Sequence, residues 1–262
     1  MTATLATPFD VRLMNITASA LFAVFGALTL ATLAAWAANH ALFAISAITV
    51  TGDLSHNNAV TLRANVLPRL GGSFFTLDLA RARKAFEAVP WVRQAVVKRE
   101  FPNRLKVTLQ EHQAVAYWGS DTDLRLINNF GEVFEANVGE VEQDTLPHLN
   151  GPDGQGAEVL AMYHVLAPLF EQIELPVDEL ELSDGGSWRV LLETGAAIEL
   201  GRGGASEVSA RVRRFLATLT QVTSRYARHA SAVESADLRH ENGYAIRLHG
   251  VSTVVTAVVP KK

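Results

Sequence analysis

The chain is 262 residues long, with a formal net charge of -4 and 48% hydrophobic residues, a composition that suits one or two domains with cores of their own. It has no basic excess, so nucleic acid is a poor candidate for a partner. It has no cysteine, which excludes disulfides and thiolate metal sites.

The first feature along the chain is the apolar stretch 16–38, which lies in a longer interval between Arg12 and Asp53 that holds no Asp, Glu, Lys or Arg. At a rise of 1.5 Å per residue, a helix over this stretch spans roughly 34 Å, enough to cross a hydrocarbon core of about 30 Å. A cleaved signal peptide and a buried helix of a soluble protein are the alternatives, but the run is too long for a typical signal peptide. We therefore predict a transmembrane helix at 16–38, after a short cytoplasmic tail at 1–15.

The orientation of this helix follows from the few charges around it. Arg12 is the one Lys or Arg close to its upstream end, and the next one downstream is Arg63. The positive-inside rule then places the N-terminus in the cytoplasm. The bulk of the chain is expected on the other side, in the periplasm if the cell is a bacterium with two membranes.

The chain after the apolar stretch predicts short elements in the order strand, helix, helix, strand, strand. Alternating apolar residues indicate the strands, and Asn or Asp caps indicate where the helices begin. In chain order, we expect a strand at 43–51, a helix capped by Asn57 or Asn58 that runs through Leu67, a helix capped by Thr76 or Asp78 that ends before Pro90, and strands at 92–100 and 105–111 joined by a turn at 101–103.

This order of elements, directly after a membrane anchor, resembles a POTRA domain. Its residues are similar to the "PWV..A.V.R..P..L.V.V.E..P.A.W" run of the FtsQ/DivIB family of bacterial cell division proteins. One departure is Gln113, where the family usually has Pro. The matching residues are Pro90, Trp91, Val92, Ala95, Val97, Arg99, Pro102, Leu105, Val107, Glu111, Ala114 and Trp118.

The second half of the chain extends the resemblance. The segment 124–134 is similar to the family's strand, turn and strand with a Gly in the turn, here Gly131. The segment from Leu200 to Phe215 resembles "LGR......R..RF", and 235–245 resembles the closing "VDLRY.NG.A", with His240 in place of the common Tyr. We also expect amphipathic helices at 157–173 and after Gly204, and short strands at 180–182, 188–192 and 197–200.

These elements predict an α+β protein. We expect an N-terminal transmembrane helix, a POTRA domain with βααββ order at 43–112, a second α+β domain with an antiparallel sheet at 113–250, and a C-terminal tail at 251–262.

The sequence holds no catalytic motif of the common hydrolases, zinc peptidases or P-loop enzymes. The resemblance implies a non-enzymatic scaffold, without cofactor, metal or small-molecule substrate, that sits at the division septum in the bacterial inner membrane. It implies FtsB and FtsL as partners, which the scaffold recruits during septum formation. A membrane-anchored POTRA module that handles other envelope proteins and a periplasmic cell-wall hydrolase are the alternatives.

The candidate partner site lies at the end of the folded chain. Asn242-Gly243 is a strong two-residue hairpin signal, so the strands on either side are expected to pair. The second strand, 244–248, then forms a sheet edge, unless 251–259 folds back as a further strand. A partner strand can pair with the main chain of an edge. The residues expected to bind the partner are Arg239, His240, Asn242, Gly243, Tyr244, Ile246 and Leu248.

Two roles remain open for these side chains. Tyr244, Ile246 and Leu248 either contact the partner or face the core of their own domain. The resemblance implies that Arg239 pairs with a carboxylate of the partner, and the fork of the arginine suits this; the alternative is a solvated surface charge.

Overall fold

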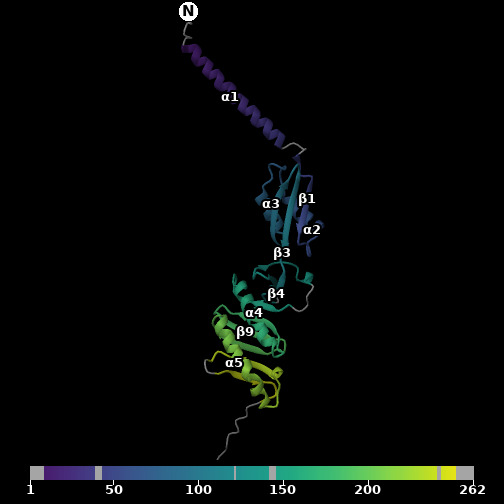
Figure 1. Cartoon of the computed structure of the whole chain (residues 1–262), viewed down its shortest axis with the longest axis vertical. Coiled ribbons are helices and arrows are strands. Elements are labelled where there is room, and N and C mark those ends of the chain that lie inside the picture. The colour runs from purple at the N-terminus through teal and green to yellow at the C-terminus, as the bar shows by residue number, and fades with distance from the viewer. Residues whose placement is uncertain (1–8, 39–42, 121, 142–145, 241–242, 252–262) are drawn as a thin grey trace, which may run out of the picture. The chain divides into compact units, whose positions relative to one another are not determined.

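The computed structural model describes residues 9–38, 43–120, 122–141, 146–240 and 243–251. The chain divides into two compact units, Met1–Glu111 and His112–Lys262 (Figure 1). Each unit has its own sheet.

The first element is the helix α1, Phe9–Ala38, which is long and apolar enough to cross a membrane. It begins at Phe9 and not at Ile16, so the boundary expected at 15/16 marks the start of the apolar run and not the start of the helix. Asp10 lies in its first turn, where a negative charge favours the helix. The hydroxyls of Thr29 and Thr32 donate to carbonyls one turn earlier, at 2.8 and 3.0 Å, so neither faces lipid unsatisfied.

The rest of the first unit has the predicted βααββ order. Its elements are β1 (Ala47–Gly52), α2 (Ala59–Val66), the 3-10 turn η2 (Leu67–Arg69), α3 (Leu79–Glu87), β2 (Val92–Glu100) and β3 (Arg104–Glu111). The sheet order is β1-β3-β2, with β1 parallel and β2 antiparallel to β3. Asn58 and Asp78 cap the two helices, each accepting from two backbone N–H groups.

The core of this unit lies between the sheet and the two helices. Leu105, Val107 and Leu109 of β3 are buried, while the residues between them are exposed. Ala82 and Phe86 of α3 pack on the same side. The alternation read from the sequence therefore predicts which face of β3 is buried.

The second unit contains one nine-stranded sheet and two long helices. The sheet order is β12-β11-β10-β9-β8-β7-β4-β5-β6. In chain order, the elements are β4 (Ala114–Trp118), β5 (Arg125–Asn128), β6 (Val133–Phe134), the 3-10 turn η3 (Val138–Glu140), β7 (His148–Asn150), α4 (Gly156–Glu171), β8 (Val177–Leu182), β9 (Ser187–Leu192), β10 (Ala197–Arg202), α5 (Ala205–Ser224), the 3-10 turn η4 (Ala230–Ala232), β11 (Val233–Asp237) and β12 (Ala245–Leu248).

The α+β class is confirmed, but the sheet is mixed and not antiparallel throughout. The pairs β4/β7, β7/β8 and β10/β11 are parallel. Two of these follow from chain connection, because α4 links β7 to β8 and α5 links β10 to β11, and a helical crossover returns the chain to the end of the sheet where it started.

The two long helices pack on each other and on the same side of the sheet (Figure 1). Trp188, Val190 and Leu192 of β9 are buried on that side, whereas Arg189 faces away and pairs with Glu199 of β10 at 3.4 Å. At β9 and β10 the sheet thus has one apolar and one polar face, whereas at β5 the successive residues Leu126 and Ile127 are both buried.

Candidate partner-binding edge

β12 is the end strand of the nine-stranded sheet as far as the structure describes the chain. It pairs antiparallel with β11, as the sequence predicts, from Asp237 opposite Ala245 to Val233 opposite Leu248. The two-residue hairpin predicted at Asn242-Gly243 is wrong, because the connection between the strands runs from residue 238 to residue 244. Leu238 donates its N–H to the Glu199 carbonyl at 2.8 Å, which prolongs the contact with β10 before the chain turns.

Three of the predicted site residues have side chains that pack on their own domain. The Tyr244 ring lies edge-on to Phe215 of α5, with centroids 5.0 Å apart, and its hydroxyl is 2.8 Å from the Thr218 hydroxyl. Ile246 packs against the core and Leu248 is buried within it. The sequence left two roles open for Tyr244, Ile246 and Leu248. In the structure, all three side chains face the core of their own domain.

The other side of β12 carries residues that the sequence analysis missed. Ala245 and Arg247 are exposed, and Arg247 lies 3.7 Å from Glu234 of β11 across the strand pair. The strict alternation of a strand was the available signal, because an inward Ile246 requires outward neighbours. The outward face of the edge is therefore small and polar.

Arg239 is exposed but engaged within the chain. Its Nε donates to Asp237 Oδ1 at 2.9 Å and its Nη2 to Oδ2 at 2.6 Å, while its backbone N–H donates to Oδ1 at 3.0 Å. These hydrogen bonds lower the pKa of Asp237 to about 2, chiefly through the side chain of Arg239. The guanidinium is therefore oriented by its own chain, with its Nη1 making no hydrogen bond to the residues that the structure describes.

A glycine of β10 makes room for this arginine. Gly201 has φ +80, and a Cβ at this position would lie 2.9 Å from Arg239 Cγ. The Leu200-Gly201-Arg202 sequence thus places a residue without a side chain beneath Arg239. Of the remaining predicted residues, His240 and Gly243 are exposed, and Asn242 lies outside the described residues.

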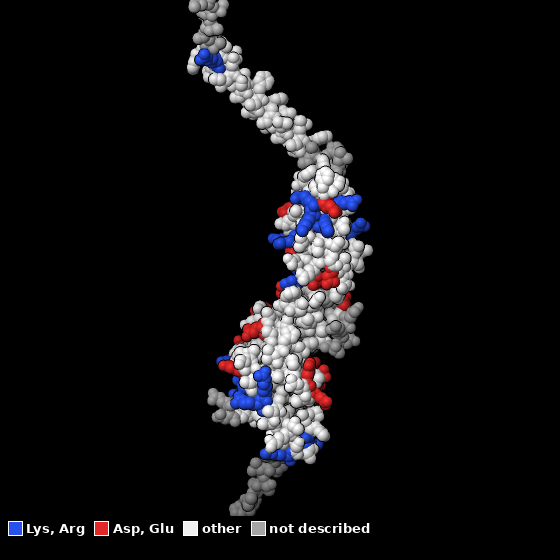
Figure 2. All heavy atoms as spheres, in the orientation of Figure 1, with Lys and Arg blue, Asp and Glu red and all other residues white. Residues whose placement is uncertain are grey.

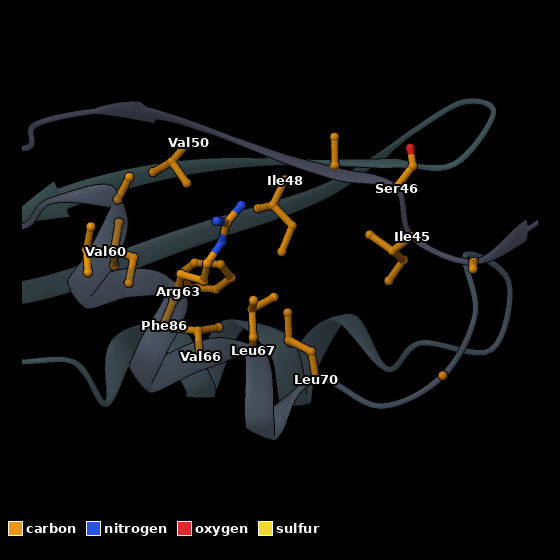
Figure 3. A pocket seen from close by; sticks show the side chains of 15 residues that line it. Ile45, Ser46, Ile48, Val50, Val60, Arg63, Val66, Leu67, Leu70 and Phe86 are labelled. Carbon is orange, nitrogen blue, oxygen red and sulfur yellow. The ribbon is translucent and has the colours of Figure 1, made fainter.

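The first unit contains a separate apolar cleft between β1 and α2, of about 720 Å³ (Figure 3). Its walls include Ile48, Val50, Leu70 and Phe86, and Arg63 extends into it. The hydroxyl group in this lining is that of Ser46, which donates to Asn103 Oδ1 at 2.9 Å, and no acid–base pair accompanies it in the lining. Among the described residues, no group of three or more His, Asp or Glu is placed to hold a metal ion.

Comparison with known proteins decides the family. The family model described as POTRA domain, FtsQ-type, matches residues 43–112, and the one described as Cell division protein FtsQ/DivIB, C-terminal, matches residues 116–239. Proteins named Cell division protein FtsQ are 42% identical in Burkholderia pseudomallei, over 92% of this chain and 94% of that protein, and 40% identical in Thiomonas arsenitoxydans, over 93% and 89%. This chain belongs to the FtsQ/DivIB family of cell division proteins.

The family assignment agrees with the division of the chain. The FtsQ-type POTRA match ends at residue 112, next to the boundary between the two units at Glu111 and His112. The FtsQ/DivIB C-terminal match ends at Arg239, so β12 lies just beyond it. A role in cell division and an apolar N-terminal helix of the kind that anchors a single-pass membrane protein follow from these findings.

Proposed function

We propose that this chain is a non-enzymatic scaffold of the bacterial divisome that recruits FtsB and FtsL during septum formation. In this proposal, α1 crosses the inner membrane with its N-terminus in the cytoplasm, and both folded units lie in the periplasm. The end position of β12 in the sheet is the observation that carries it, because an end strand can accept a strand of a partner.

In this proposal, main-chain hydrogen bonds supply most of the affinity for the partner. A partner strand added beside β12 pairs with its outward N–H and C=O groups, whatever the partner's side chains are. The inward side chains Tyr244 and Ile246 act indirectly, since their packing on α5 holds the strand in place. Because a strand that is already fixed loses little entropy on binding, this rigid support favours the complex.

Arg239 is proposed to give the site its charge preference. Asp237 binds two of its nitrogen atoms, which fixes the plane of the guanidinium at the start of the connection to β12. A carboxylate of the partner can then approach Nη1 without first ordering a long side chain. His240 and Gly243 lie in the same exposed connection and complete the proposed surface.

Depletion of the protein in its own cells tests this function. Cells that lack it are expected to form filaments without septa, and the full chain is expected to restore division and to co-purify with FtsB and FtsL. Normal septation after depletion would contradict the proposal. Release of peptidoglycan fragments by the soluble fragment 43–262 would contradict its non-enzymatic part.

A further inference from the structure

One end of the first unit exposes aromatic side chains. Phe101, in the turn between β2 and β3, is 77% exposed, and Phe75 is 51% exposed. The two are linked through Phe74, whose ring centroid lies 5.2 Å from that of Phe75 and 6.4 Å from that of Phe101. Phe43 closes the row, at 4.9 Å from Phe75. We call Phe43, Phe75 and Phe101 the aromatic end.

The aromatic end lies where the chain arrives from α1. The N–H of Ser46, just before β1, donates to the Asn103 carbonyl at 2.9 Å, which holds the β2–β3 turn beside the incoming chain. Five peptide links separate Ala38, the last residue of α1, from Phe43. A chain extends at most about 3.6 Å per residue, so this link keeps Phe43 within about 18 Å of the end of α1.

Basic side chains surround this end on the exposed face of the sheet. Lys98 of β2 lies directly opposite Lys106 of β3. Arg104 follows on the same face of β3, opposite the exposed Glu100 of β2. The three basic side chains are exposed, and none forms an ion pair with another described residue. Two lysines opposite each other across strands repel, so the pair favours a site where an anion comes between or above them. We call Lys98, Arg104 and Lys106 the basic face.

The charge of the whole domain has the same sign. Residues 43–111 contain ten Lys and Arg against five Asp and Glu, a net charge of +5 in a chain whose total is -4. Figure 2 shows Lys and Arg side chains gathered on the first unit. The excess of positive charge is thus confined to residues 43–111, the part of the first unit that follows α1.

We propose that the aromatic end and the basic face dock the first unit on the surface of the membrane that α1 crosses, with anionic phospholipid headgroups as the ligand. Exposed aromatic rings favour the headgroup region, and lysine and arginine bind lipid phosphates. Lysine side chains reach further by extending their stems toward the phosphates. Such docking fixes the orientation of the unit and does not depend on any division protein.

The aromatic end and the basic face can also bind an acidic protein, but their position close to the end of α1 favours lipid headgroups. The short link from α1 keeps the aromatic end close to the bilayer at all times, so the local concentration of headgroups there is high. A protein partner would have to displace them. The experiment below separates the two cases.

The absence of cysteine from the chain allows a clean test. The full chain with Phe101→Cys carries a nitroxide label and is placed in nanodiscs of phosphatidylcholine alone or with phosphatidylglycerol. Val60→Cys, 76% exposed on α2, is the matched control position. Phe75→Cys provides a second label at the aromatic end. The measurement is the accessibility of each label to a water-soluble nickel reagent.

With phosphatidylglycerol, we expect the label at 101 to be several-fold less accessible than the label at 60, and the protection to weaken in phosphatidylcholine. Lys98→Glu with Lys106→Glu, or the milder Gln pair, is expected to abolish it. Arg63→Glu with Lys84→Glu, an equal charge change at exposed helical positions, is expected to leave it intact. Equal accessibility at 101 and 60 would overturn the proposal. The proposal would also be overturned if the Lys98/Lys106 and Arg63/Lys84 substitutions reduced the protection of the label at 101 equally. Protection that appears only when another division protein is added would overturn it too.

Discussion

The buried carboxylate of Glu111 holds Asn57 by two hydrogen bonds to one oxygen. Oε1 accepts from the backbone N–H of Asn57 at 2.9 Å and from its Nδ2 at 2.8 Å, while Oε2 accepts from the N–H of His56 at 2.9 Å. These bonds join the end of β3 to the segment that leads into α2. The side chain of Glu111 is only 1% exposed.

The first prediction concerns this carboxylate. Glu111→Gln should lower the free energy of unfolding of the fragment 43–262 by about 2–3 kcal/mol, because an amide NH2 would meet N–H donors that a carboxylate oxygen now satisfies. Denaturant unfolding measures this. Glu100→Gln, at an exposed position of β2, is the control and should change little. Equal stability of the two variants would show that the hydrogen bonds of Glu111 do not stabilise the domain.

The second prediction concerns Trp91, which is 3% exposed and stacks on the His56 ring at 3.9 Å between centroids. Trp91→Ala should cost about 3–5 kcal/mol of unfolding free energy through lost burial. Phe101→Ala, which removes an exposed ring, is the control. A loss below about 1 kcal/mol for Trp91→Ala would be inconsistent with the burial of the indole.

The backbone of Trp91 refines this test. Its φ is +69, a region that glycine adopts more easily than other residues. Trp91→Gly should therefore be about 1 kcal/mol more stable than Trp91→Ala, although both lack the indole. The opposite order would mean that the conformation at this position relaxes in the variants.

The first unit was the more predictable from sequence. β2 has the bounds expected from its pattern, and Asn58 and Asp78 cap the helices as candidate caps should. These features are local, since caps, turns and alternation act over a few residues. In the second unit, the parallel pairs of β7 depend on partners far along the chain, and a three-residue strand is too short to show a period.

The third prediction concerns pH. The pKa of Glu179 on β8 is raised above 4.5. Burial of the carboxyl group is the largest cause, and repulsion by the negative charge of Glu181 is the second. The ionised form of Glu179 is thus disfavoured in the folded state. The resulting loss of folding stability is absent below pH 4.5, grows between pH 4.5 and the raised pKa, and is present in full above that pKa. Glu179→Gln should raise the midpoint of thermal unfolding at pH 7 and lose this advantage below pH 4.5.

Glu181→Gln separates the two causes in that experiment. It removes the repulsion but not the burial of Glu179, which is the larger cause, so its gain at pH 7 should be smaller than that of Glu179→Gln. A larger gain for Glu181→Gln would show that repulsion and not burial governs the site.

The fourth prediction concerns membrane topology. A reporter fused after Lys262 should be active only if it is a type that works in the periplasm, because Arg12 lies in α1 just before the apolar run 16–38 and the chain has no Lys or Arg from there to Arg63. Alkaline phosphatase and green fluorescent protein fusions make the paired measurement. Cytoplasmic activity, or a mature protein that lacks its first forty residues, would contradict an uncleaved anchor with the N-terminus inside.

The candidate site was only partly predictable. The sequence predicts β12 as an end strand on the condition that 251–259 does not fold back beside it, and most of that segment lies outside the described residues. The direction of the side chains of this strand cannot be inferred, because Tyr244 gains its inward position from Phe215 and Thr218 of a helix some thirty residues earlier. Likewise, the pairing of Arg239 with Asp237 depends on the backbone bend that follows β11.

Binding of FtsB to proline variants of β12 tests the central claim most directly. Successive N–H groups of a strand point alternately toward the neighbouring strand on each side, here β11 and the proposed partner strand. Proline has no N–H, so one of Ala245→Pro and Ile246→Pro removes a donor to the partner, and the other removes a donor to β11. Ala245→Val keeps the N–H at the exposed position and is the matched control. Arg239→Glu tests the proposed charge contact, with Arg213→Glu, at an exposed position of α5, as its control.

The measurement is capture of the fragment 43–262 by the immobilised periplasmic part of FtsB, beside circular dichroism of each variant. We expect that the proline variant that keeps the parent's thermal midpoint loses capture, that Arg239→Glu folds but binds weakly, and that Ala245→Val binds as the parent does. Folded Ala245→Pro, Ile246→Pro and Arg239→Glu variants that all capture FtsB as well as the parent would contradict a binding site at the β12 edge.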